Sequence, residues 1–369
     1  MASRADQLAS NLSLAKFSKA TDLKKRLWFT LGALIVFRFL SFVPMPGIDP
    51  TALAGAVQNT RGGVLDIFNT FSGGALERAS LIALGIMPYI SASIIVQLMT
   101  SVVPSLEALK KEGEQGRKVI NQYTRYGTVL LGTLQAYGIA AGLESGNGLV
   151  LDPGWFFRIT TVVTLLGGTM FLMWLGEQIT ARGIGNGISL IIFAGIAAGL
   201  PTAFAGTLEL GRTGALSTAL ILLVILVAIG VITLIVFVER AQRRLLIQYP
   251  KRQVGNRMFQ GDTSHLPLKL NTAGVIPAIF ASSLLLLPAT AAGFANSAEL
   301  PSWATTVIAA LGHGQPAFIV LYGMLIAFFA FFYTAIVFNP KDTADNLKKH
   351  GGFILGIRPG ERTADYIDY

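Results

Sequence analysis

Cysteine is absent from this chain of 369 residues, and histidine occurs only 3 times. Without cysteine, the chain has no disulfide bonds, no thiolate metal sites and no cysteine nucleophile. Charged residues are also scarce, at 13% of the chain against 52% hydrophobic residues. Because soluble domains carry about 25% charged residues, this composition predicts a membrane protein.

Catalytic and nucleotide-binding motifs are missing as well. The three histidines lie outside the long apolar stretches, so none is placed as a base or a metal ligand inside a membrane. No G-x-x-x-x-G-K-[ST] phosphate loop occurs, and the glycines of 183–187 are wrongly spaced for a dinucleotide. We therefore expect no enzyme, no cofactor and no bound metal.

Eight apolar stretches are long enough to cross a bilayer, for which a helix needs about 20 residues. They are residues 27–43, 79–101, 126–143, 156–176, 188–206, 215–238, 272–291 and 317–338. Of the 29 Lys and Arg residues, 24 fall in the N-terminal tail, the loops after the even-numbered spans or the C-terminal segment. The positive-inside bias predicts that these parts, and the N-terminus, are cytoplasmic.

A nine-residue segment occurs in two related copies, Gly85–Ser93 and Gly274–Ser282, which agree at Gly, Pro, Ile, Ala and Ser in register. In the predicted topology the first copy runs towards the cytoplasm and the second runs away from it. Inverted repeats with helices broken by Gly and Pro mark the working centre of a two-repeat membrane pathway. Chance recurrence of small residues at helix contacts is the alternative explanation.

The predicted fold is therefore all-α and polytopic, with two inverted-repeat halves. Spans 1–5 form one half, and spans 6–8 begin the other, so we expect two further spans to complete ten. The predicted parts are a cytoplasmic tail (1–26), an N-terminal half (27–206), a truncated C-terminal half (207–338) with a cytoplasmic loop (239–270), and a cytoplasmic loop after span 8 (339–369).

Five long strings of this chain resemble the SecY/Sec61-alpha family of protein-conducting channels. They are GIMPYISASIIVQL (85–98), WLGEQITARGIGNGISLIIFAGI (174–196), FVERAQRR (237–244), HLPLKLNTAGVIPAIFASS (265–283) and GIRPGERTADYID (356–368). The resemblance implies a bacterial inner-membrane channel that moves unfolded preproteins across the membrane and releases hydrophobic segments laterally into lipid. It implies as partners the SecE and SecG subunits, the motor ATPase SecA, the ribosome through its RNA, signal peptides and preproteins, and anionic membrane lipids.

The resemblance also implies which residues line the channel. A constriction ring is expected at Ile86, Ile90, Ile192 and Ile279. Stiff β-branched side chains in such a ring exclude water and ions by dewetting. The family implies a plug below the ring, formed by the re-entrant helix of residues 61–74. Its residues include Val64, Leu65, Asp66, Ile67, Phe68 and Phe71. The apolar pattern alone favours an amphipathic segment in the outer interface.

Two further sets of residues follow from the resemblance. A lateral gate between the halves is expected at Ser91, Gln97 and Leu287, although ordinary hydrogen bonding between helices also explains such residues. Docking of SecA or the ribosome is expected at Arg243, Arg244, Lys251 and Arg358, although attraction to anionic lipid also explains basic loops. The alternative function is an ion-coupled secondary transporter, but the predicted spans contain few of the ionisable groups that it needs.

Overall fold

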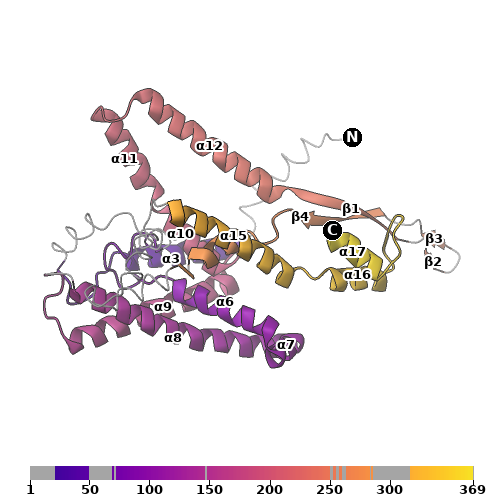
Figure 1. Ribbon diagram of the computed structural model, residues 1–369, viewed down its shortest axis with the longest axis horizontal. Helices are drawn as coiled ribbons and strands as arrows, with labels where there is room; N and C mark the ends of the chain where they lie inside the picture. The colour runs from indigo at the N-terminus through magenta and orange to yellow at the C-terminus, as the bar shows by residue number, and fades with distance from the viewer. Residues whose placement is uncertain are drawn as a thin grey trace. The chain divides into compact units, whose positions relative to one another are not determined.

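The computed structural model describes residues 21–49, 69, 72–145, 148–249, 252–254, 257–259, 263–282, 284–285 and 316–368. Most of these residues are helical (Figure 1). The chain divides into two compact units. The first comprises Met1–Ala205 and Ser282–Leu321, and the second comprises Gly206–Ala281 and Tyr322–Tyr369.

Helices build the first unit. They are α3 (Thr21–Leu40), α6 (Met87–Val102), α7 (Pro104–Lys111), α8 (Glu114–Ser145), α9 (Trp155–Arg182) and α10 (Gly187–Ala197), followed by α11 (Leu200–Arg212), which continues into the second unit. Helix α8 packs against both α6 and α9, and α9 also contacts α3 and α10 (Figure 1). The core of this unit therefore lies between antiparallel helices.

Glycine residues allow these helices to lie close to one another and to the turns that precede α6. A Cβ atom at Gly127 of α8 would lie 3.2 Å from the Cβ atom of Ala92 on α6. A Cβ atom at Gly168 of α9 would overlap the backbone carbonyl of Leu81. Small residues at such contacts are typical of membrane helices, which pack by close van der Waals contact because lipid removes the hydrophobic driving force.

Alanine at Gly168 is expected to destabilise the first unit, because the added methyl group meets backbone that cannot rotate away. We expect the free energy of unfolding to fall by about 1–3 kcal/mol, the usual cost of overpacking. The matched control is Gly167→Ala, because no atom lies within 4 Å of a Cβ at that neighbouring position. Thermal unfolding of the purified protein in detergent measures both variants, and equal midpoints would contradict this packing argument.

The second predicted span begins later than the sequence indicates. The sequence predicts a helix from residue 79, but α6 begins at Met87 and residues 72–86 form turns and a short bridge. Gly85 has a φ of +55°, which glycine adopts without strain. Pro88 lies in the first turn of α6, where its missing N–H costs nothing. At the other end, α6 and α7 are bent by 102° across a short break.

The second unit combines helices with a small antiparallel sheet. Its helices are α12 (Thr218–Arg240), α15 (Pro316–Val337, from Tyr322 onward in this unit), α16 (Pro340–Lys349) and α17 (Glu361–Asp368). Its strands are β1 (Gln242–Gln248), β2 (Arg252–Val254), β3 (Arg257–Phe259), β4 (Thr263–Lys269) and β5 (Phe353–Ile354). The prediction of an all-α chain missed these strands.

The loops predicted after spans 6 and 8 belong to one folded piece of the second unit. Strand β1 pairs with β4 on one side and with β5 on the other, where Ile247 faces Ile354. Leu245, Ile354 and Ile367 form a buried apolar cluster beneath this sheet. We call β1, β4, β5, α16 and α17 the sheet platform.

Within the described residues, four helices are long and apolar enough to cross a membrane, or five if the bent pair α6 and α7 is counted as one span. The four are Trp155–Arg182, Gly187–Arg212, Thr218–Arg240 and Pro316–Lys349. Predicted spans 1 and 3 are helical, as α3 and α8, but are less apolar. Residues 283 and 286–291 of predicted span 7 lie outside the described residues. The count of eight spans and the inverted repeat therefore stay predictions.

Candidate functional site

The isoleucines expected in the constriction lie on three separate segments. Ile86 and Ile90 are one turn apart at the start of α6, where the N–H of Ile90 donates to the carbonyl of Ile86 over 3.2 Å. Their exposed fractions are 4% and 9%. Ile192 is half-buried on α10 of the same unit. Ile279 is half-buried in helical residues 276–282, of which 276–281 belong to the second unit. The structure thus places two of the four on one helix turn, and the ring itself stays a prediction.

Local backbone chemistry fixes where Ile86 lies. Ile86 is the residue that caps the N-terminus of α6, with φ −98° and ψ 4°. The N–H of Gly85 just before it donates to the carbonyl of Ile82 over 2.8 Å. Ile86 therefore lies at a junction between a tight turn and a helix, so its position depends on the glycine and proline that flank it.

The residues predicted to form the plug, 64–68 and Phe71, lie outside the described residues. The described residues beside them, Asn69 and Ser72 onward, are joined by side-chain hydrogen bonds. The Asn69 side chain accepts from the Glu77 N–H over 3.0 Å and donates to the Glu77 carboxylate over 3.2 Å. The hydroxyl of Ser72 donates to the Asn69 carbonyl over 3.0 Å. The turn at the C-terminal side of the predicted plug is thus held by its own side chains.

Two arginines from distant positions meet at this turn. Nη1 of Arg38 and Nη2 of Arg78 both donate to the Gly73 carbonyl, over 2.9 Å and 2.8 Å. Their guanidinium groups also lie 4.8 Å and 4.5 Å from the ring centre of Phe42. Burial and the neighbouring charge of Arg38 lower the pKa of Arg78. Arginine remains protonated under such conditions, so Arg78 keeps its charge. No motif or periodicity in the sequence predicts this pairing.

The residues predicted for the lateral gate differ in their environments. Ser91 is buried on α6, with 7% of its surface exposed, whereas Gln97 on the same helix is exposed. Leu287 lies outside the described residues. The structure packs α6 against α8. The gate as a whole stays a prediction.

The described basic residues predicted for docking lie on the sheet platform or directly beside it. Arg243 and Arg244 are exposed on β1, where they face Leu268 and Pro267 of β4. Arg358 is exposed just after β5. Lys251 lies outside the described residues. Basic side chains from two predicted loops, more than 100 positions apart in the sequence (Arg244 and Arg358), are therefore gathered by one folded platform.

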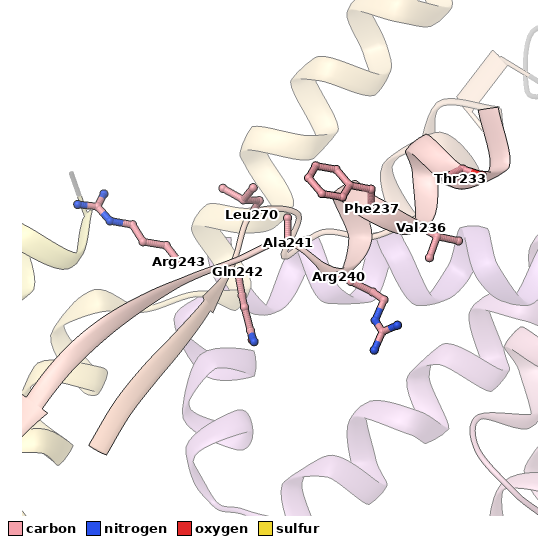
Figure 2. Close-up of a pocket in the computed structure, with 8 residues that line it drawn as sticks. All are labelled: Thr233, Val236, Phe237, Arg240, Ala241, Gln242, Arg243 and Leu270. Carbon is pink, nitrogen blue, oxygen red and sulfur yellow. The ribbon is translucent and has the colours of Figure 1, made fainter. Parts of the chain in front are cut away.

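An open hollow of about 710 Å³ lies where α12 meets the platform. Figure 2 shows its lining, Thr233, Val236, Phe237, Arg240, Ala241, Gln242, Arg243 and Leu270. The side chains of Arg240 and Arg243 point in different directions (Figure 2). Because the two cations do not converge, the hollow is not arranged as a phosphate-binding site.

Two ion pairs connect helices of the first unit. Arg125 on α8 binds both carboxylate oxygens of Glu177 on α9 over 2.7 Å. Arg158 on α9 binds Glu144 on α8, and its Nη1 lies 3.2 Å from the hydroxyl of Tyr137. Among the described residues, no group of three or more His, Cys, Asp or Glu side chains is placed to hold a metal ion. These pairs join α8 to α9.

Apolar helices of spanning length, joined to a small polar sheet, define this chain as an integral membrane protein of several spans. Similar folds occur among solved structures. One is described as a protein-conducting channel, with a TM-score of 0.66 and 15% identity, covering 94% of this chain and 80% of that one. Another is Sec61 in the canine ribosome-channel complex, with a TM-score of 0.63 and 15% identity, covering 94% and 82%. At this identity the likeness concerns the fold.

Sequence comparison gives the family. The family model SecY matches residues 80–369. The protein translocase subunit SecY of Escherichia coli K12 is 58% identical over 350 residues, which are 94% of this chain and 79% of that protein. The SecY of Buchnera aphidicola is also 58% identical, over 91% of this chain and 95% of its own length. The SecY of Rickettsia felis is 56% identical over 96% and 82%. This chain belongs to the SecY family.

Proposed function

We propose that this chain is the central subunit of a protein-conducting channel in the bacterial inner membrane. It translocates unfolded preproteins and releases hydrophobic segments sideways into lipid. The observation that carries the proposal is 58% identity to a protein translocase subunit over 94% of the chain. A channel of this kind needs no catalytic site of its own, so the energy for transport comes from a partner.

The test is transport in reconstituted vesicles. The full-length chain, assembled with SecE and SecG, is expected to bring an unfolded preprotein into a protease-protected state when SecA and ATP are added. The control is the same preprotein held folded by a tightly bound ligand, which should stay accessible. Absence of protection, or uptake of a small solute driven by an ion gradient, would contradict the channel and favour the transporter alternative.

The proposed constriction is formed by Ile86, Ile90, Ile192 and Ile279. A polypeptide pathway must admit every kind of side chain, so its narrowest point needs apolar residues that bind none of them strongly. The burial of Ile86 and Ile90 on one turn of α6 supports this assignment for the first half. In the proposed topology the N-terminus is cytoplasmic and the two Gly-Pro copies run in opposite directions.

The proposed plug is the segment of residues 61–74. The described turn at its C-terminal end supports this role, because the Gly73 carbonyl is held by two guanidinium groups. A swinging segment needs one fixed end, and charge-assisted hydrogen bonds are about twice as strong as neutral ones. A lateral gate at Ser91, Gln97 and Leu287 is proposed on the family resemblance alone.

The proposed docking face for SecA and the ribosome is the sheet platform. Its exposed Arg243, Arg244 and Arg358, with Lys251, provide positive charge for an acidic protein surface or for ribosomal RNA. Phosphate contacts would make ribosome docking sensitive to salt. The canine Sec61 structure was determined in a ribosome-channel complex, which supports the ribosome as one partner. Anionic lipids are proposed to contact the basic residues that the partners leave free.

A further inference from the structure

We propose that Asn271 is a positioning residue that couples the sheet platform to the helical residues 276–282, which carry Ile279. This inference rests on the proposed function, because it takes the platform as the place where a transport partner docks. All the contacts that carry it lie within the second unit.

The Asn271 side chain joins the end of α12 to the start of the next helical segment. Its Nδ2 donates to Oε1 of Glu239, in the last turn of α12, over 2.8 Å. Its Oδ1 accepts from the N–H of Gly274 over 3.0 Å. Gly274 has a φ of +61°, in the left-handed region that favours glycine. A single half-buried amide therefore fixes both the separation of the two segments and the turn that begins the second.

The contact lies directly at the base of the β1 and β4 hairpin. Gln242 pairs with Lys269 at the last rung of the ladder. The N–H of Leu270 then donates to the Ala241 carbonyl over 3.2 Å. The hydrogen bond from Asn271 to Glu239 is the next connection between the segment after β4 and the segment before β1. Figure 2 shows Ala241, Gln242 and Leu270 gathered at this junction. A displacement of the hairpin therefore reaches Asn271 without an intervening flexible segment.

On its other side the helical segment is tied to α15. The Tyr322 hydroxyl donates to the Ala278 carbonyl over 3.3 Å. The Phe280 ring packs edge-on against the rings of Phe329 and Tyr333, with centroids 5.6 Å and 5.9 Å away. Such aromatic pairs prefer defined geometry, so they resist sliding.

The contacts among the platform, α15 and the segment of Ile279 form a closed loop. Helix α15 leads through the cap at Asn339 into α16, whose N-terminal N–H at Lys341 is bound by the Asn339 side chain over 3.1 Å. Strand β5 follows and pairs with β1 of the hairpin. The platform is thus joined to the segment of Ile279 by two routes. One passes through α15, and the shorter one passes through Asn271.

Substitutions that change the charge or the donor of this hydrogen bond can separate the positioning role of Asn271 from a general role in folding. Asn271→Asp keeps an oxygen for the Gly274 N–H but faces Glu239 with a second carboxylate, so the bond to α12 is lost. Glu239→Gln keeps a carbonyl oxygen as the acceptor for Asn271. In the double variant the new amide donates to the new carboxylate, which restores the bond with the donor and the acceptor exchanged.

The experiment uses the complete channel with SecE and SecG in vesicles and measures both SecA binding and preprotein transport. Asn271→Asp should lower transport about fivefold or more, the lower end of typical coupling between sites, while SecA affinity stays unchanged. Glu239→Gln should transport normally, and the double variant should recover. Glu239→Ala removes the acceptor of the same hydrogen bond and should lower transport equally. This variant replaces Asn271→Asp in the experiment if Asn271→Asp does not assemble.

Several outcomes would overturn the proposal. They are full transport by Asn271→Asp or by Glu239→Ala, a double variant that remains as defective as Asn271→Asp, or loss of SecA binding in step with transport. Failure of the unmodified channel to transport preprotein would instead count against the proposed function, so the two failures can be told apart.

Discussion

Glycine in place of Ile86, Ile90 and Ile279 is expected to raise the resting ion conductance of the complete channel by about tenfold or more, because each 1.4 kcal/mol removed from a barrier is a factor of ten in rate. The barrier to ions in an apolar constriction is the cost of wetting it. Removing three branched side chains widens the constriction and exposes polar backbone to water. Conductance is measured in planar bilayers without a translocating chain.

The first unit offers a matched control for this experiment. Ile90 and Ile95 lie on the same helix, but Ile90 has 9% of its surface exposed and Ile95 has 42%. Replacing either residue by glycine lowers the stability of the helix by the same amount, about 1 kcal/mol. Only Ile90→Gly should contribute to the leak. If the triple variant conducts no more than the unmodified channel, or if Ile95→Gly leaks equally, the proposed ring is wrong.

The second large effect is expected at Arg358. Changing Arg358 to Glu should lower SecA-driven transport about tenfold or more, since a hydrogen bond to a charged group is worth about 1.5–3 kcal/mol and charge reversal adds repulsion. The backbone at this position does not depend on the side chain, because the Thr363 hydroxyl donates to the Arg358 carbonyl over 2.9 Å. The platform should therefore stay folded.

Arg362→Glu is the matched control for Arg358→Glu. Arg362 is exposed on α17 of the same platform, and its reversal changes net charge by the same amount. Transport by Arg362→Glu should stay near normal, as should insertion and assembly of both variants. Equal loss in the two variants would indicate a general effect of charge, and full transport by Arg358→Glu would refute its docking role.

The apolar helices were the part of the fold most accessible from sequence. The stretch 317–338 corresponds to α15 (Pro316–Val337), and the stretch 215–238 corresponds to α12 (Thr218–Arg240). Long apolar runs specify helices locally, because in lipid a helix satisfies every backbone group within its own segment. The start of α6 was harder to predict. Gly85 lies in a turn before α6, but the apolar stretch continues through this turn, so its hydropathy does not mark where the helix begins.

The site was accessible only through individual residues and the family resemblance. Periodicity and composition gave no indication that Arg38 and Arg78 would share the Gly73 carbonyl, because they are 40 positions apart and neither belongs to a motif. Charge alone equally gave no reason to expect Arg244 and Arg358 on one folded platform. The contact of Asn271 with Glu239 was also missed, although both residues lie inside strings that carry the resemblance.

The sequence by itself determined that the chain lies in a membrane, where its most apolar helices fall, and which family it resembles, because apolar runs and long motifs are local properties. Only the tertiary structure decided that β1 pairs with β5 and that Asn271 bridges two helical segments. Those contacts join residues far apart in the chain, and their partners are chosen by hydrogen-bond geometry and packing after the chain has folded back on itself.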